Sequence, residues 1–264
     1  MTRILVFDSG VGGLSVAAEI SALLPTAELA YLADNDFFPY GTKPEAVLIE
    51  RVDRVVSEAV ARLAPDAVVI ACNTASTVVL PQLRAHLACP VVGVVPAVKP
   101  AAARSRNRII GLLGTPGTVR RRYTEDLIQR FAADCTVHRV GSAELVEMAE
   151  RALEGEAVPI AAIRSVLAPF FDLPPEARPD TIVLACTHFP LLRTAMLEAA
   201  PPGTEFIDSG RAVAERVRHV IGDAATAGEP VNTALFTRDE PSLRRRLPAF
   251  VARGFPDVGF LSIG

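Results

Sequence analysis

Two cysteines of this chain end runs of residues that are alike in length and character. The two stretches are Asp66-Ala-Val-Val-Ile-Ala-Cys72-Asn73-Thr74 and Asp180-Thr-Ile-Val-Leu-Ala-Cys186-Thr187-His188. Each apolar run is typical of a buried strand. The polar residues that follow lie where open α/β sheets place their ligand sites. Two such turns, each carrying a thiol, predict two halves that face each other across one site.

A thiol at the end of a strand can act as a nucleophile, a metal ligand or a base. A histidine near a cysteine favours acyl transfer, but the spacing of Cys186 and His188 does not fix a contact between them. A metal site needs further ligands at cluster spacing, and the sequence shows none. Two opposed thiols suit a third reaction, the inversion of a stereocentre. One thiolate removes a proton from one face of a carbon, and the other thiol returns a proton to the opposite face.

The other two cysteines carry no such signal. Cys89 precedes Pro90, and Cys135 lies between a predicted helix and a predicted strand, so both are interpreted as small apolar fillers. The chain has no C-x-x-C pair, which disfavours a zinc knuckle or a thioredoxin-like motif. Structural disulfides are disfavoured in a reducing cytoplasm.

The elements that must position the two cysteines alternate between strand and helix patterns. Besides the two cysteine strands, strands are expected at residues 3–7, 29–33, 91–95, 108–113, 136–140 and 233–237, and helices at 14–24, 119–132, 143–153, 158–171 and 190–199. A helix ending at residue 63 is expected to begin with Thr42-Lys-Pro-Glu45 as a capping box. Alternation of this kind predicts parallel sheets with helices on both faces.

Repeated motifs indicate two related halves. The cysteine turn occurs twice, and Asp8-Ser9-Gly10 near the start is repeated by Asp208-Ser209-Gly210. So long a period is a domain-level pseudo-symmetry rather than a solenoid. The expected fold class is α/β, with two pseudo-symmetric domains, mainly parallel sheets and an active site in the interdomain cleft. The first domain is predicted at 1–97 plus 211–264, and the second at 98–210.

The glycine-rich turn from Asp8 to Gly13 leaves alternatives open. Beyond a plain tight turn, its backbone N–H groups can face an anion near the start of the next helix. Gly10-x-Gly12 can also begin a dinucleotide fingerprint, with Asp34 as the later acidic residue, although Ser15 stands at the third glycine position. A nicotinamide-dependent oxidoreductase therefore stays an alternative, as does a non-catalytic binding protein built on two lobes. A P-loop is excluded because no Gly-Lys-Ser/Thr occurs.

Composition narrows the class of protein. The chain has 264 residues, of which 50% are hydrophobic and 22% charged, an ordinary globular balance. Its formal net charge of -3 gives no basic footprint for nucleic acid. No apolar stretch is long enough for a membrane span, and the first residues lack the pattern of a signal peptide. A cytoplasmic protein without nucleic-acid or membrane partners is expected.

Six motifs, taken in order, resemble those of the aspartate/glutamate racemase family, and of its glutamate racemases in particular. They are Phe7-Asp8-Ser9-Gly10-Val-Gly-Gly-Leu, Phe38-Pro39-Tyr40-Gly41, Ala71-Cys72-Asn73-Thr74-Ala-Ser, Gly111-Leu-Leu-Gly-Thr115-x-Gly-Thr118, Ala185-Cys186-Thr187-His188-Phe-Pro-Leu-Leu and Ile207-Asp208-Ser209-Gly210. The resemblance covers about residues 3–220, and the residues beyond carry no recognised motif.

The resemblance implies an enzyme that needs no cofactor or metal, interconverts L- and D-glutamate, and supplies D-glutamate for peptidoglycan. The catalytic residues it implies are Cys72, Cys186, Asp8, His188 and Glu150. Asp8 is expected beside Cys72, and His188 beside Cys186 with Glu150 in support. Substrate contacts are implied for Asp8, Ser9, Tyr40, Gly41, Asn73, Thr74, Thr115, Thr118, Thr187 and His188.

Two segments depart from the family pattern. Ser142-Ala143 stands where members often have Cys-Pro, and Asp34-Asn35-Asp36-Phe37 stands where many place a threonine and an arginine. Aspartate racemases share the two-cysteine design, so aspartate is an alternative substrate. A homodimer is the candidate assembly. Since the chain begins almost at its first strand, without the N-terminal extension associated with activation, no stimulation by a peptidoglycan precursor is expected.

Overall fold

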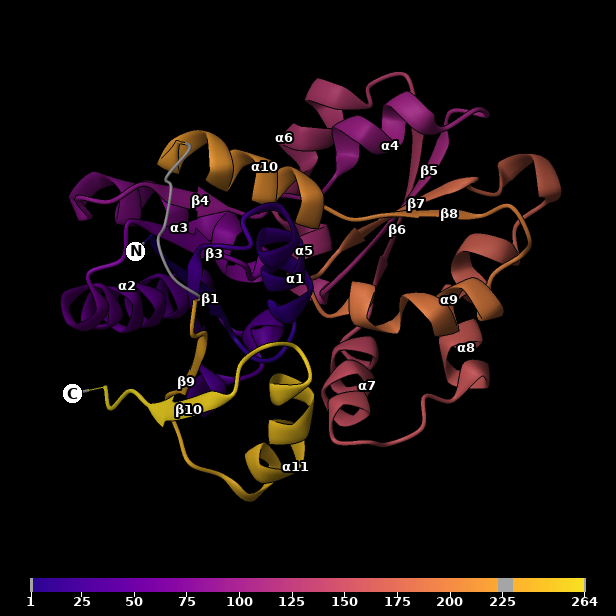
Figure 1. Ribbon diagram of the computed structural model, residues 1–264. Helices are drawn as coiled ribbons and strands as arrows, with labels where there is room; N and C mark the ends of the chain where they lie inside the picture. Colours follow the sequence, from indigo (N-terminus) through magenta and orange to yellow (C-terminus); the bar gives the residue numbers. More distant parts are fainter. Residues whose placement is uncertain (1, 223–229, 264) are drawn as a thin grey trace.

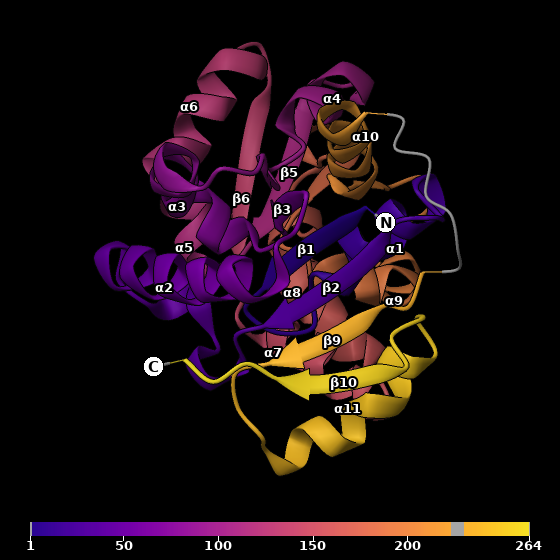
Figure 2. The same cartoon turned by 60° about the vertical axis from the view of Figure 1, so that its left-hand side comes forward.

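Two parallel β-sheets lie side by side, and helices cover both faces of each (Figures 1 and 2). Figure 1 draws the computed structural model, which describes residues 2–222 and 230–263. Each sheet with its helices is called a lobe below. The α/β class and the parallel sheets predicted from the sequence are confirmed.

The sheet of the first lobe has six strands in the order β10-β9-β2-β1-β3-β4. Its central strands are buried and apolar between their charged ends, because helices cover both of their faces. The register sets Phe7 of β1 between Leu32 and Ile70 on the neighbouring strands. The strands are β1 (Arg3–Asp8), β2 (Glu28–Ala33), β3 (Ala67–Ile70), β4 (Val91–Gly93), β9 (Thr233–Phe236) and β10 (Asp257–Phe260).

The sheet of the second lobe has four strands in the order β6-β5-β7-β8. Its central strands are buried, whereas the edge strand β6 alternates between half-buried and exposed residues. The strands are β5 (Ile109–Gly114), β6 (Thr136–Gly141), β7 (Thr181–Ala185) and β8 (Glu205–Ile207).

The two lobes repeat one strand order, because β2-β1-β3-β4 of the first matches β6-β5-β7-β8 of the second. Cys72 and Cys186 follow the corresponding strands β3 and β7, so the repeat of the cysteine turns is structural. The Asp-Ser-Gly repeat is not: Asp8-Ser9-Gly10 follows the first strand of its lobe, whereas Asp208-Ser209-Gly210 follows the last strand of the other. The two related halves inferred from the repeated motifs are present in the strand order, but the two Asp-Ser-Gly motifs do not occupy equivalent positions, since a three-residue likeness does not fix a place in a sheet.

Helices form two layers on each sheet. In the first lobe, α1 and α10 pack on one face and α2 and α3 on the other, and α11 joins the core beneath α1. In the second lobe, α4, α5 and α6 cover one face and α7, α8 and α9 the other. The helices are α1 (Leu14–Leu23), α2 (Glu45–Leu63), α3 (Asn73–His86), α4 (Val98–Arg104), α5 (Pro116–Arg120), α6 (Arg122–Phe131), α7 (Glu144–Leu153), α8 (Ile160–Phe171), α9 (Arg193–Ala199), α10 (Gly210–Ile221) and α11 (Pro241–Val251), with short 3₁₀ turns η1 (Asn35–Phe37), η2 (Tyr40–Thr42), η3 (Pro175–Ala177) and η4 (Phe189–Leu192).

The chain passes from one lobe to the other between β4 and α4, and returns between β8 and α10. The last strands, β9 and β10, extend the first sheet beside β2. These crossings support a division into residues 1–97 plus 211–264 and residues 98–210, which stays a proposal.

The predicted capping box at the start of α2 is wrong. The helix begins at Glu45 with Pro44 at the N-cap position, and no side chain caps it. Thr42 instead ends the turn η2. The carboxylate of Glu45 accepts a hydrogen bond from Arg121 Nε of the second lobe at 3.1 Å. A contact between lobes has therefore replaced the local contact that the sequence pattern indicated.

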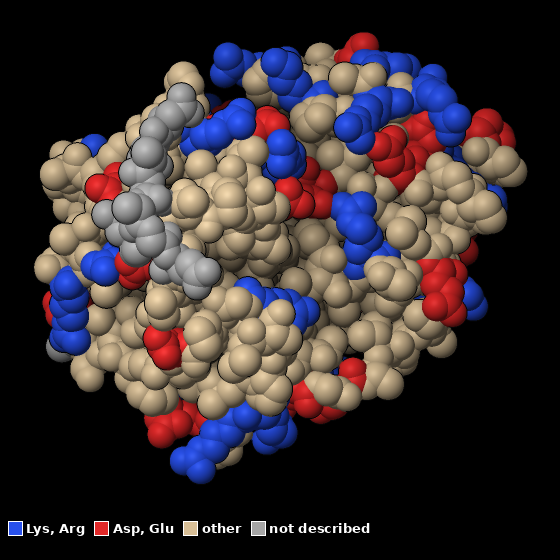
Figure 3. Space-filling view, in the orientation of Figure 1, with Lys and Arg blue, Asp and Glu red and all other residues tan. Residues whose placement is uncertain are grey.

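Charged side chains of both signs are interspersed on the face drawn in Figure 3. Blue Lys and Arg side chains neighbour red Asp and Glu side chains there, and no broad area of one sign covers that face. Within the described ranges, no helix is both long and apolar enough to cross a membrane.

Candidate active site

Two strand-to-helix turns, one from each lobe, meet at a single cavity. Cys72 follows β3 and occupies the N-cap position of α3, and Cys186 follows β7 directly. Both thiols are almost fully buried, and both line the same cavity between the lobes. Because the lobes share one strand order, equivalent turns carry the two sulfur atoms to one place from opposite sides.

Cys72 lies in surroundings that favour its protonated form. Its Sγ is 3.6 Å from Ser9 Oγ. Burial, followed by the negative charge of Asp8, raises the pKa of Cys72 from 9.0 to about 12, and hydrogen bonds from the Ala75 amide and Ser9 oppose the rise. The thiol is therefore protonated at neutral pH in these surroundings.

Asp8 ties the two lobes together behind Cys72. One carboxylate oxygen accepts a hydrogen bond from the Gly10 amide at 2.8 Å, and the other accepts one from Thr187 Oγ1 at 3.1 Å. The side chain is fully buried, and burial raises its pKa although nearby His188 opposes the rise. Asp8 acts on Cys72 through its charge, while Ser9 makes the direct contact.

His188 links Cys186 to Glu150. Its Nδ1 is 3.8 Å from Cys186 Sγ, and its Nε2 is 2.8 Å from Glu150 Oε1. Burial alone would lower the pKa of His188, but the contacts with Cys186 and Glu150 raise it well above 6.5. The Cys186–His188 contact, which the sequence spacing left open, is present. Glu150 reaches the cysteine through the histidine.

The glycine-rich turn binds a carboxylate of the protein itself, that of Glu150. The Val11 amide donates a hydrogen bond to Glu150 Oε1 at 3.0 Å. Two glycines leave room for this approach: a Cβ added at Gly10 would lie 2.2 Å from Glu150 Oε1, and one added at Gly12 would lie 2.4 Å from His188 Nδ1. The glycines are required here by the close packing of the second lobe.

A group of hydroxyls lines the opposite wall of the cavity. Thr74 Oγ1 of the first lobe is 3.2 Å from Thr115 Oγ1 and 3.4 Å from Thr118 Oγ1 of the second. The Asn73 side-chain oxygen beside them is buried and has no hydrogen-bond partner among the described residues. A buried polar atom without a partner is costly, so Asn73 offers an acceptor to a ligand with N–H groups.

The site residues predicted from the sequence fall into two groups. Those that line the cavity with the two thiols are Ser9, Tyr40, Gly41, Asn73, Thr74, Thr115, Thr187 and His188. Those in the layer behind them are Asp8, Thr118 and Glu150, all buried. Glu150 is separated in this way from Glu144 and Glu147, which lie exposed on the same helix.

The acidic residue of the proposed dinucleotide fingerprint is already engaged within the protein. Asp34 is fully buried and accepts hydrogen bonds from Arg51 at 2.6 Å and 2.9 Å, and from Tyr40 Oη at 2.6 Å. It has no free oxygen to offer a ribose. The Tyr40 hydroxyl likewise points at Asp34, so Tyr40 meets the cavity with its remaining surface.

Two arginines of the site were missed by the sequence reasoning. Arg246 of α11 lies 2.8 Å from Glu150 Oε2. Arg121, buried between the lobes, donates from Nη1 to the Thr74 carbonyl oxygen at 2.5 Å and to Thr77 Oγ1 at 2.7 Å. Neither belongs to a motif, and both lie in elements whose contacts arise only when the lobes pack.

No cluster of three or more His, Cys, Asp or Glu side chains suited to a metal ion occurs in the part of the chain that the structure describes. The groups that the cavity gathers are thiols, an imidazole, hydroxyls, an amide and the carboxylate of Glu147. Together they can exchange protons and hold a small polar molecule.

Comparison with known proteins places this site in a family. A model of the Asp/Glu/Hydantoin racemase family matches residues 14–217, a segment that contains both cysteine turns. The chain belongs to this family. The resemblance seen in the six motifs is thereby confirmed.

Relatives within the Asp/Glu/Hydantoin racemase family are similar over nearly the whole chain. The glutamate racemase of Sodalis glossinidius (strain morsitans) is 46% identical over 265 residues, which are 98% of this chain and 91% of the relative. That of Klebsiella pneumoniae (strain 342) is 49% identical over 97% of this chain and 90% of its own. The crystal structure of Escherichia coli glutamate racemase, in complex with L-glutamate and the activator UDP-MurNAc-ala, has a TM-score of 0.94 and 46% identity, covering 100% of this chain and 99% of its own. For this chain, the absence of stimulation by a precursor stays a prediction.

Proposed function

We propose that the protein is a glutamate racemase, which interconverts L- and D-glutamate by proton transfer at the α-carbon without a cofactor and supplies D-glutamate for peptidoglycan. The observation that carries the proposal is the pair of buried thiols at equivalent turns of the two lobes, lining one cavity. The glutamate racemases that are 46% and 49% identical over nearly the whole chain support glutamate as the substrate.

Inversion at carbon needs a base on one face and an acid on the other. Cys186 acts as the base toward one enantiomer: the raised pKa of His188 keeps an imidazolium 3.8 Å from its sulfur, and a neighbouring imidazolium stabilises a thiolate. Cys72 is then the acid, because its raised pKa keeps the thiol protonated until the carbanion forms. The groups exchange roles when the other enantiomer reacts.

The reverse direction requires Cys72 as a thiolate, although burial and the charge of Asp8 disfavour that form. A substrate ammonium group beside the sulfur supplies the compensating positive charge, since an opposite charge lowers the pKa of a thiol. Binding of the substrate itself therefore activates Cys72. This keeps the thiol unreactive until an amino acid occupies the site.

The cavity recognises the substrate through uncharged polar groups. Asn73, with its unpartnered oxygen, accepts a hydrogen bond from the ammonium group. Ser9, Thr74, Thr115, Thr118 and Thr187, with the Gly41 backbone and Tyr40, surround the two carboxylates. Of these, Thr118 acts from behind, through its hydrogen bond with Thr115. Hydroxyls and amides of this kind can bind carboxylates without fixing the charge on either thiol.

Two alternatives remain distinct from this proposal. A racemase for aspartate would use the same thiols with a shorter substrate, and the family itself includes enzymes for other substrates. A nicotinamide-dependent oxidoreductase would need an acidic residue for the ribose, and buried Asp34 is bound by Arg51 and Tyr40.

Exchange in heavy water tests the proposal. The protein is incubated with L-glutamate in heavy water, without any cofactor, while optical rotation and α-deuterium are followed. Early D-glutamate should carry deuterium while the remaining L-glutamate retains protium, because separate thiols remove and return the proton. Protium transferred from substrate to product would contradict the two-base mechanism. Faster turnover of L-aspartate than of L-glutamate would overturn the substrate assignment.

The compartment and the assembly of the enzyme are part of the proposal. The four cysteines are free of disulfides, as a reducing cytoplasm requires, which favours that compartment. A homodimer is proposed as the assembly, and light scattering on the purified protein will measure the mass. No nucleic-acid or membrane partner is proposed.

A further inference from the structure

The C-terminal helix α11 belongs to the first lobe but contacts the active-site helix of the second. Leu243 and Phe250 anchor α11 in the core of the first lobe, and its neighbour α7 carries Glu150 and packs in the second lobe. The two helices lie next to each other in Figure 1. The residues after about 220 were without a recognised role in the sequence.

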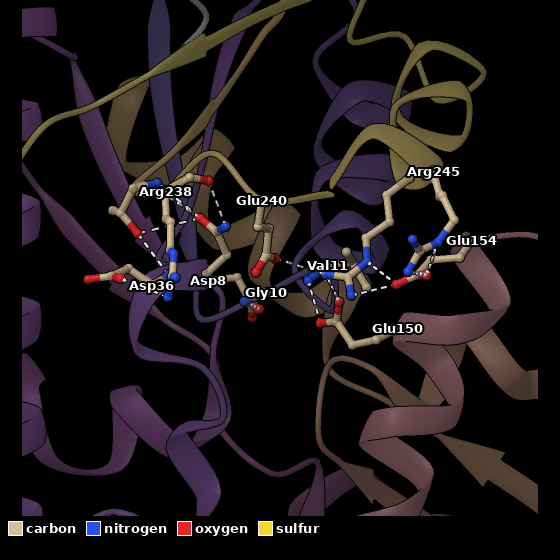
Figure 4. A network of polar contacts seen from close by, with 12 residues as sticks. Asp8, Gly10, Val11, Asp36, Glu150, Glu154, Arg238, Glu240 and Arg245 are labelled. Atoms are coloured by element: carbon tan, nitrogen blue, oxygen red, sulfur yellow. Dashed lines mark hydrogen bonds and ion pairs between the residues drawn. The ribbon is translucent and has the colours of Figure 1, made fainter. Parts of the chain in front are cut away.

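Arg246 of α11 is held between two carboxylates of α7. Its guanidinium lies 2.8 Å from Glu150 Oε2 through Nη1 and 2.7 Å from Glu154 Oε1 through Nη2. Only 15% of the arginine side chain is exposed, and Glu150 and Glu154 are almost completely buried. Figure 4 shows Glu150 near Val11, and Glu154 beside Arg245.

The two carboxylate oxygens of Glu150 contact different partners. Oε1 receives the hydrogen bonds of the Val11 amide and His188. Oε2 is buried and has no hydrogen bond within the described residues, and its ion pair with Arg246 compensates its charge there. A buried carboxylate without a paired charge is strongly disfavoured. Loss of Arg246 would allow Glu150 to turn or to take up a proton, and His188 would lose a charged acceptor.

We propose that Arg246 is a positioning residue for the proton transfers of Cys186, acting through Glu150 and His188 from a helix of the opposite lobe. The inference rests on the proposed racemase function. It gives the C-terminal segment a place in the reaction, because this segment supplies the arginine that pairs with Glu150. It also couples the approach of the lobes to the state of one thiol and leaves the other untouched.

The adjacent arginine is a matched control. Arg245 leaves the same helix with the same charge, but among the described residues it pairs with Glu154 alone, through Nε at 2.6 Å and Nη2 at 2.5 Å. Its side chain is 58% exposed. Replacing Arg245 with glutamine removes one interlobe ion pair and leaves Glu150 and His188 as they are.

The test must separate an effect on one thiol from a general loss of structure. Two enantiomers have equal free energies, so kcat/KM is the same in both directions for every variant. The α-deuterium isotope effect on kcat/KM, by contrast, can differ between the two enantiomers. Slower transfer at Cys186 makes proton removal more rate-limiting for the enantiomer that faces Cys186, and less so for the other. The isotope effects of the two enantiomers then move in opposite directions.

Racemisation of L- and D-glutamate, each with protium or deuterium at the α-carbon, is measured for the wild type and for Arg246→Gln, Arg246→Lys, Arg245→Gln and His188→Asn. Arg246→Gln should lower kcat/KM roughly 10-fold to 100-fold, by analogy with residues that orient metal-bound histidines. It should shift the two isotope effects in opposite directions, with the increase in the same enantiomer as for His188→Asn. Arg245→Gln should match the wild type in both isotope effects.

The lysine variant keeps the test decisive if the glutamine variant does not fold. A lysine retains the charge but not the planar fork that spans two carboxylates, so a smaller shift in the same direction is expected. Unchanged isotope effects in a folded Arg246 variant, or equal shifts for both enantiomers, would overturn the inference. Failure of the wild type to racemise glutamate would instead refute the proposed function.

Discussion

The two thiols of the site are alike in position and unlike in their surroundings. Cys72 is next to a hydroxyl and feels the charge of Asp8, whereas Cys186 is next to an imidazole backed by Glu150. A symmetric fold thus holds an asymmetric pair. In the proposed reaction the asymmetry sets the roles of the two thiols, with Cys72 protonated and Cys186 beside a histidine whose positive charge stabilises a thiolate.

Removal of either sulfur tests this assignment directly. Cys72→Ser and Cys186→Ser should each lower the racemisation rate at least about 100-fold, because a serine hydroxyl is a far weaker acid and each proton-transferring group contributes on that scale. Circular dichroism of the glutamate solution measures the rate. Cys89→Ser changes a half-buried cysteine outside the cavity and should keep the wild-type rate. Full activity of either cavity variant would refute the two-thiol mechanism.

The Glu150–His188 pair predicts a pH-dependent contribution to stability. The pKa of Glu150 is lowered from 4.5: burial would raise it, but His188 and Arg246 outweigh burial. A carboxyl whose pKa is lowered on folding stabilises the fold above the unfolded-state pKa and loses this as pH falls through the folded-state pKa. At pH 7, the free energy of unfolding of the wild type should therefore exceed that of Glu150→Gln by about 3 to 5 kcal/mol, the usual loss when a buried pair is broken.

Urea unfolding of both proteins between pH 7 and pH 3 measures this difference. The difference should stay constant down to about pH 4.5, the ordinary pKa of the group, and then shrink. A difference that persists undiminished at the most acidic pH, or that grows on acidification, would show that Glu150 is not ionised in the folded protein.

At the scale of elements, the strands and the turns after them could be predicted from the sequence. Buried parallel strands are continuous apolar runs, so β3 and β7 and the polar turns after them stood out, and family motifs marked the residues of these turns. The roles of Arg246 and Arg121 were not readable, because their partners are far away in the sequence. The predicted capping box at Glu45 was wrong for the same reason, because its carboxylate accepts a hydrogen bond from Arg121 of the other lobe.

Gly10 gives a test of the glycine-rich turn. A Cβ there would lie 2.2 Å from Glu150 Oε1, and the carboxylate could move away only by breaking its bonds with Val11 and His188. Gly10→Ala should destabilise the fold by roughly 1 to 3 kcal/mol, the usual cost of overpacking, and should depress racemisation although no polar atom is removed. Thermal unfolding and the rate assay measure both effects.

Gly259→Ala is the matched substitution on the distant strand β10, where the nearest atom is the end of the Leu235 side chain at 3.1 Å. It should leave the racemisation rate unchanged. If Gly10→Ala were as active as this control, the turn would not be what holds Glu150 in place.

At the scale of the whole molecule, hydrogen bonds across the lobe interface are as important as the cores. Thr187 Oγ1 donates to Asp8, Ser15 Oγ donates to the Thr187 carbonyl oxygen at 2.8 Å, and Arg121 spans α3 and α2. These ties fix the distance between the two cysteine turns. Pseudo-symmetry was predictable from the repeated cysteine motif, whereas the docking of the lobes was not, since it depends on single polar contacts without a sequence pattern.

A substitution of Arg121 tests the contribution of these contacts between the lobes. Arg121→Gln removes a buried guanidinium that donates to Thr74, Thr77 and Glu45. The loss should be about 2 to 3 kcal/mol of stability, the contribution of hydrogen bonds that involve a charged group, together with a raised KM for glutamate because the cavity wall at Thr74 loosens. Arg120→Gln, at an exposed neighbouring position, should change neither. An Arg121 variant with unaltered KM and unfolding midpoint would contradict this role.

The insertion of the second lobe between β4 and β9 has a consequence for biosynthesis. A ribosome makes the chain in order, and domains generally fold as their residues emerge. The second lobe, with Glu150 and His188, is complete before β9, α11 and β10 exist. Arg246 is thus among the last groups of the site to be synthesised. A nascent chain that already has both cysteines still lacks the arginine that pairs with Glu150.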